Sequence, residues 1–176
     1  RYEAVHEIGD WEELRRRIDP PDRRCFAFFH PALVDEPLIF VEVALTRDIP
    51  GAIAPILATG REMVGSDKMR TAVFYSISNC QRGLAGVSFG NFLLKRVIDD
   101  LHRDFPKLRH FATLSPLPGF AAWARKNPQE LAAAGLDVDL AEVAAGEWTR
   151  NAATARKINA SLAQLAARYL ALAKSN

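Results

Sequence analysis

The chain has 176 residues, of which 49% are hydrophobic and 25% charged, a composition typical of one soluble globular domain and not of a disordered segment. Its net charge of +2 and isoelectric point near 8.7 do not require a nucleic-acid partner, and its arginine clusters lack the interleaved aromatic residues of a nucleic-acid-binding module. No stretch reaches the roughly 20 apolar residues of a membrane span, so we predict binding to neither nucleic acid nor membrane.

The first third of the chain predicts a helix followed by a strand pair. Asp10, with Glu13 three residues later, resembles a capping box at the start of a helix that prolines end. Two apolar runs, 24–29 and 38–45, flank a loop that contains prolines, and we predict that they pair as antiparallel strands. Residues 52–57 predict a short helix.

Residues 71–116 predict a strand, a glycine-bearing turn, a helix and a second strand. Residues 71–77 are β-branched and aromatic, as in a strand buried on both faces. The next helix has apolar residues at steps of four, three and four, namely Leu94, Ile98, Leu101 and Phe105. The run 110–114 then returns to the sheet and carries Ser115 at its C-terminal tip, the sheet edge where open α/β sheets usually bind ligands.

The turn before this helix is a candidate anion site. Glycines let the backbone approach a ligand closely, and the free amides of a helix N-terminus attract negative charge; the glycines here are Gly83, Gly86 and Gly90. On pattern alone, glycines after a strand more often only turn the chain. The spacing does not meet the GxGxxG fingerprint, and no Gly-Lys-Ser/Thr is present, which argues against a dinucleotide site and a P-loop.

The C-terminal third predicts helices. Residues 120–126 predict a helix after the serine strand. The last helix has an apolar stripe typical of core packing, formed by Ile158, Leu162, Leu165, Tyr169 and Leu172.

The two cysteines are too few for a disulfide framework, and no Cys-x-x-Cys or His-Glu-x-x-His metal motif occurs. We therefore predict no metal site and a reducing, intracellular (cytoplasmic) compartment. Cys25 opens an apolar strand and is predicted to be a small core residue. Cys80 has no neighbouring histidine that would make it a thiolate nucleophile.

Two stretches carry a family resemblance. The segment FYSISNCQRGLAGVSFGNFLLKRVIDDLHRDFPKLRHFATLSPLPGFAAW resembles the catalytic domain of the malonyl-CoA decarboxylases, and RCFAFFHP followed by EPLIFVEVALT resembles the same family upstream. The resemblance implies an α/β fold of the GNAT acyltransferase type, a mixed sheet with flanking helices, as one catalytic domain over residues 1–176. It implies that Ser115, in the LSP motif, is catalytic. It also implies that malonyl-CoA is held by Ala85, Gly86, Val87, Ser88, Phe89, Gly90 and Asn91.

The family also has an active-site histidine in a His-Leu-x-Asn-Gly-Ala motif. None of the four histidines of this chain lies in such a motif. Only His30, which ends a strand, is a candidate proton donor, and a histidine at such a position is more often structural. The resemblance therefore implies that the chain is a fragment without turnover of its own, and that the family's N-terminal helical domain and C-terminal strands lie outside it. A homo-oligomer would assemble through such outside regions.

The resemblance implies decarboxylation of malonyl-CoA to acetyl-CoA and carbon dioxide with no separate cofactor, since the thioester of the substrate is the electron sink. Two alternatives stay open. The same fold serves acyl-CoA N-acyltransferases, which need a base and an acceptor groove that this sequence does not identify. A CoA-binding module without catalysis is the other.

Overall fold

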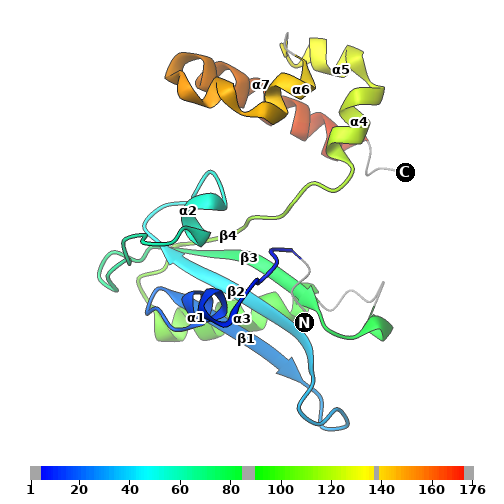
Figure 1. Ribbon diagram of the computed structural model, residues 1–176. Coiled ribbons are helices and arrows are strands. Elements are labelled where there is room, and N and C mark those ends of the chain that lie inside the picture. The colour runs from blue at the N-terminus through cyan, green and yellow to red at the C-terminus, as the bar shows by residue number, and fades with distance from the viewer. Residues whose placement is uncertain (1–4, 85–89, 137–138, 173–176) are drawn as a thin grey trace. The chain divides into compact units, whose positions relative to one another are not determined.

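The computed structural model describes residues 5–84, 90–136 and 139–172, with only the backbone of residues 90 and 91. The chain divides into two compact units, Arg1–Pro116 and Leu117–Asn176, each of which has its own buried core (Figure 1). That residues 1–176 act as one catalytic domain stays a prediction.

Unit 1 is built on a four-stranded mixed sheet with the order β1-β2-β3-β4. The strands are β1 (Arg23–Phe29), β2 (Pro37–Thr46), β3 (Thr71–Asn79) and β4 (His110–Thr113). The first three are antiparallel neighbours, as predicted for the first pair, and β4 lies parallel to β3. The predicted strand after the helix is therefore confirmed as the edge of the described sheet.

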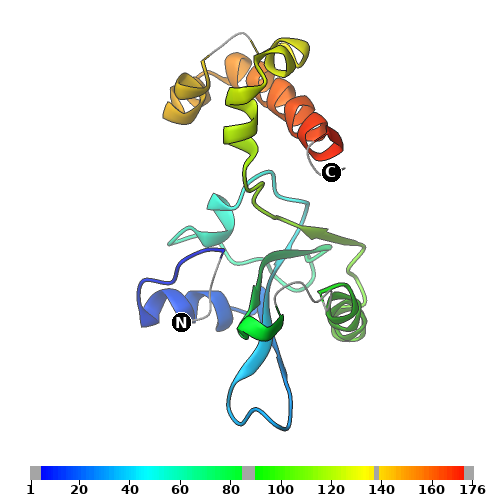
Figure 2. The same ribbon diagram turned by 90° about the vertical axis from the view of Figure 1, so that its right-hand side faces the viewer.

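Helices cover both faces of this sheet (Figure 2). On one face lies α3 (Gly90–Asp104), whose Val97 and Leu101 are fully buried against β2 and β3 residues such as Val43 and Phe74. The predicted periodicity is confirmed, because Leu94, Ile98 and Phe105 pack around the same cluster. On the other face lie α1 (Trp11–Ile18) and α2 (Ala54–Leu57).

The predicted cap of α1 is confirmed. The carboxylate of Asp10 accepts a hydrogen bond from the Glu13 amide at 2.7 Å, which satisfies one of the free amides at the helix start. The Glu13 carboxylate in turn accepts from the Gly9 amide at 3.0 Å. Such a cap stabilises a helix by about 1 kcal/mol.

A β-bulge interrupts the pairing of β2 with β3. Glu42 pairs with Ser76, whereas the next residue, Val43, pairs with Phe74, so that Tyr75 is the extra residue on β3. Bulges bend a strand, raise its twist and re-aim a side chain, and they are frequent beside active sites. The bulge puts Tyr75 on the face with α2, where it packs with Ile56.

Unit 2 is helical. Its core gathers around Ile158 and Leu165 of the long helix α7 (Ala152–Leu172), and the Tyr169 hydroxyl donates to the Pro118 carbonyl at 2.5 Å. The predicted apolar stripe is confirmed in its middle, but its last member, Leu172, is exposed. The preceding elements are α4 (Phe120–Lys126), α5 (Pro128–Ala133), α6 (Leu140–Ala145) and the 3-10 helix η2 (Glu147–Arg150).

The prediction that Cys25 is a core residue is wrong. Cys25 is exposed, as are Ala27 and Phe29, because the residues of β1 that pack into the core are Phe26 and Phe28 on the α3 face. An edge strand has one well-covered face here, and its alternate residues face away from it.

Candidate functional site

A pocket surrounds Ser115 at the sheet edge where β3 and β4 part. Its volume is about 180 Å³ and its lining is mostly apolar, formed by Val5, Phe74, Tyr75, Ile77, Leu114, Ser115 and Pro116. Ser115 itself is exposed. The structure therefore places the predicted catalytic serine, exposed to solvent, on the lining of a small and mostly apolar pocket.

The opening arises because β4 is short. Its pairing with β3 ends at Thr113, opposite Phe74, and the last hydrogen bond runs from the Leu114 amide to the Phe74 carbonyl at 2.9 Å. β3 continues to Asn79, whereas the chain after Leu114 leaves the sheet. Ser115 therefore lies at the carboxyl end of a parallel strand, the edge at which α/β sheets bind their ligands.

The predicted substrate-holding turn lies mainly outside the described residues. Residues 85–89 are not described, while the 3-10 helix η1 (Arg82–Leu84) precedes them and α3 begins at Gly90. The predicted strand before this segment and the predicted helix after it are confirmed. That residues 85–91 hold malonyl-CoA stays a prediction, supported by the 15-residue helix that begins within this segment.

Tyr75 is a lining residue that the sequence analysis did not identify. Its side chain is 1% exposed, and its hydroxyl has no hydrogen-bond partner among the described residues. Burial, followed by the negative charge of Glu42, raises the pKa of Tyr75, so the hydroxyl stays protonated at physiological pH. Aromatic residues are common in buried strands, so the sequence gives no signal that Tyr75 lines a pocket. Its position at the bulge is what sets it apart, and the bulge is visible only in the structure.

A buried charged pair acts electrostatically on Tyr75 of this pocket. Glu42, 1% exposed, stands in the otherwise apolar run of β2, and its carboxylate is 3.6 Å from the guanidinium of Arg17. Arg17 also donates to Glu13 at 2.6 Å. Burial lowers the pKa of Arg17, but the hydrogen bond to Glu13 and the charge of Glu42 outweigh it and the net direction is upward. A carboxylate within an apolar strand run is the signal that could have marked this pair.

The histidines of the chain do not line the Ser115 pocket. His30 is exposed and its Nδ1 accepts from the Ala32 amide at 3.1 Å, an arrangement typical of a local turn. The ring of His102 lies 4.6 Å from that of Phe111, and the ring of His6 lies 6.4 Å from that of Tyr75.

Three further features bear on the type of site. Burial raises the pKa of the Cys80 thiol, which disfavours the thiolate form that a nucleophilic cysteine needs. Within residues 5–84, 90–136 and 139–172, no three His, Cys, Asp or Glu side chains gather in a group able to hold a metal ion. Over the same ranges, no helix combines the length and the apolar character needed to cross a bilayer.

The mixed sheet, the strand-turn-helix and the opening beside the last parallel strand define an α/β protein with a GNAT-like fold. The family described as malonyl-CoA decarboxylase C-terminal domain matches residues 1–176, and this chain belongs to that family.

Similar proteins share this description. The chain is 47% identical over 123 residues to the mitochondrial malonyl-CoA decarboxylase of Anser anser anser, covering 69% of this chain and 24% of that protein. It is 35% identical over 192 residues to the mitochondrial malonyl-CoA decarboxylase of Rattus norvegicus, covering 96% of this chain and 39% of that protein.

Solved structures agree. The malonyl-CoA decarboxylase of Agrobacterium vitis is 55% identical with a TM-score of 0.78, and the match covers 96% of this chain and 42% of that one. The malonyl-CoA decarboxylase of Rhodopseudomonas palustris is 50% identical with a TM-score of 0.77, and the match covers 98% of this chain and 43% of that one. The chain thus spans less than half the length of the relatives that it matches.

Proposed function

We propose that this chain holds malonyl-CoA and contributes Ser115 to its decarboxylation to acetyl-CoA and carbon dioxide. The observation that carries the proposal is the pocket at the tip of β4, in which Ser115 lies beside the part of β3 that extends past its pairing with β4, in a chain of the malonyl-CoA decarboxylase family. The mostly apolar lining of that pocket would help to exclude water from the reacting atoms.

The chemistry needs an electron sink and a proton. The bond between the carboxylate carbon and the methylene carbon of the malonyl group breaks, and carbon dioxide leaves. The electron pair stays on the methylene carbon and delocalises onto the thioester oxygen as an enolate. One proton then adds to that carbon to give acetyl-CoA. Because the thioester accepts the electrons, the reaction needs no metal or organic cofactor beyond CoA itself.

The role proposed for Ser115 is to donate a hydrogen bond at the acyl end of the ligand, to the carboxylate or to the thioester oxygen. A donor aimed at a developing oxyanion typically lowers the barrier by about 3 to 4 kcal/mol. The helix start at residues 85–91 would hold the phosphates, since the amides there attract negative charge. The alternative, which the sequence pattern without the family resemblance favours, is that Ser115 only turns the chain before Pro116.

The proton donor is not identified among the described residues. The family resemblance assigns this step to the histidine of the His-Leu-x-Asn-Gly-Ala motif, and general acid catalysis typically contributes about 100- to 10,000-fold. His30 is a poor alternative, because its Nδ1 is engaged in a local turn. Inactivity of the 176 residues alone and assembly as a homo-oligomer both stay predictions.

Product analysis of the polypeptide that the gene encodes tests the proposal. Incubation with malonyl-CoA should yield acetyl-CoA and carbon dioxide in equal amounts, with no dependence on an added amine. Release of free CoA that requires an amine would instead indicate an N-acyltransferase. Binding of malonyl-CoA without any product would indicate a CoA-binding module.

A further inference from the structure

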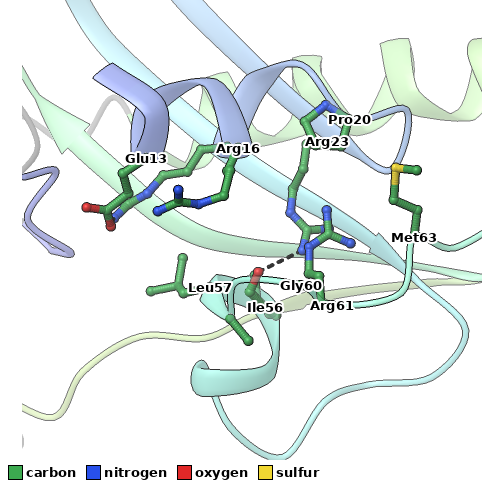
Figure 3. Close-up of a pocket in the computed structure, with 11 residues that line it drawn as sticks. Glu13, Arg16, Pro20, Arg23, Ile56, Leu57, Gly60, Arg61 and Met63 are labelled. Carbon is green, nitrogen blue, oxygen red and sulfur yellow. Dashed lines mark hydrogen bonds and ion pairs between the residues drawn. The ribbon is translucent and has the colours of Figure 1, made fainter. Parts of the chain in front are cut away.

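A second pocket of unit 1 lies beside the C-terminal half of α1, between the start of β1, α2 and the segment 58–63 (Figure 3). Its volume is about 140 Å³, several times what one water molecule needs. Its lining includes none of the residues of the Ser115 pocket and none of residues 85–91. The charged part of the lining is Glu13 with Arg16, Arg17, Arg23 and Arg61.

Two of these arginines compete for one buried carboxylate. Asp22, which is fully buried, accepts hydrogen bonds from Arg61 at 2.6 and 2.8 Å. Arg23 is left 3.6 Å from the same carboxylate and donates instead to the carbonyls of Asp22 and Ile56, at 2.9 and 2.8 Å. Burial, then repulsion by Arg61, lowers the pKa of Arg23. The positive charge of Arg23 is therefore incompletely compensated.

The other two arginines have donors to spare. Arg16 is half-buried and makes no hydrogen bond or ion pair with the described part of the chain. The side chain of Arg17 is 4% exposed, and its Nε has no acceptor among the described residues. A buried guanidinium donor without an acceptor is unfavourable, so an anion that accepts from it would be stabilised.

We propose that this pocket binds a small organic carboxylate. Four guanidinium groups of the lining meet three carboxylates, that of Glu13 in the lining and those of Asp22 and Glu42 behind it, which leaves an excess of positive charge at a half-open site. Guanidinium forks match the geometry of carboxylates and phosphates alike. The remaining lining decides between them, because Ile56, Leu57 and Met63 offer an apolar wall that suits a short hydrocarbon body and not inorganic phosphate.

The test is a calorimetric titration of succinate, a small dicarboxylate, into the full polypeptide at constant ionic strength and with saturating CoA present throughout. The variant is Arg16→Gln, which should fold because Arg16 makes no hydrogen bond or ion pair among the described residues and acts on Glu13 only through its charge. The matched control is Arg15→Gln, the neighbouring arginine of the same helix, which pairs with Asp19 at 2.9 Å and does not line the pocket.

Succinate should bind with one site per chain. Arg16→Gln should weaken it about tenfold or more, the equivalent of one charge-assisted hydrogen bond, whereas Arg15→Gln should stay within about twofold. Arg16→Lys should keep part of the affinity, since it keeps the charge but loses the fork. Absence of saturable binding, equal affinity in Arg16→Gln, or an equal loss in Arg15→Gln would overturn the site. Inorganic phosphate that binds as tightly, with the same dependence on Arg16, would overturn the carboxylate assignment.

Discussion

Asp22 should be one of the residues on which the stability of unit 1 depends most. Its carboxylate is fully buried and accepts three hydrogen bonds, two from Arg61 at 2.6 and 2.8 Å and one from the Val64 amide at 3.0 Å. In Asp22→Asn the single amide oxygen cannot replace all of these acceptors, and the new NH₂ group would face a guanidinium. Arg61 and Arg23 would both lose their buried counter-charge.

The expected loss is about 3 to 5 kcal/mol, the usual cost of removing one partner of a buried ion pair. This is a large share of the roughly 5 to 15 kcal/mol that stabilises a typical domain. Urea denaturation followed by circular dichroism measures it. The matched control is Asp19→Asn, which removes an exposed carboxylate paired with Arg15 and should cost less than about 1 kcal/mol.

The pH dependence of this loss follows from the pKa of Asp22. Burial raises it, but the hydrogen bonds from Arg61 and Val64 outweigh burial and hold the pKa below its ordinary value of 3.8. A carboxyl with a lowered folded pKa contributes stability above its unfolded pKa and loses it as the pH falls through the folded one. The difference between Asp22→Asn and the unchanged protein should be constant near neutral pH and shrink below about pH 4. A loss below 1 kcal/mol at neutral pH would refute the reasoning.

Two further substitutions probe the ligand site. Gly86→Val should weaken CoA binding in calorimetry while the circular dichroism spectrum is kept, because a side chain there would hold the ligand away from the backbone amides; unchanged affinity would remove this turn from the proposed site. Tyr75→Phe should leave the free energy of unfolding unchanged or raise it, because the buried hydroxyl has no acceptor among the described residues; a loss of more than about 1 kcal/mol in urea denaturation would show that the hydroxyl is hydrogen-bonded.

Elements with local signals could be predicted from the sequence. The steps between Leu94, Ile98 and Leu101 define α3, because one face of a helix must be apolar to pack on a sheet. The cap at Asp10 is equally local, since the acceptor and the amide it satisfies are three residues apart. The place of Ser115 at the sheet edge could be predicted because the strand before it is recognisable in the sequence, and the serine follows the carboxyl end of that strand.

Features that depend on pairing between distant residues could not be predicted. Tyr75 becomes the bulged residue only because of the register between β2 and β3. The Asp22–Arg61 pair joins residues 39 apart in sequence. From the sequence alone, each would be expected to be a charged residue exposed to solvent. Cys25 was misjudged because an apolar strand does not reveal which of its two faces a helix will cover.

The measurement that tests the central proposal most directly is the effect of Ser115→Ala on turnover and on binding in the same full polypeptide. Carbon dioxide release from malonyl-CoA should fall by roughly 100- to 1,000-fold, the equivalent of about 3 to 4 kcal/mol, while CoA affinity changes little. This pattern is expected of a group that acts on the acyl end of the ligand in the transition state. Near-normal turnover would contradict the account, and Ser115 would then be a residue that only turns the chain after β4.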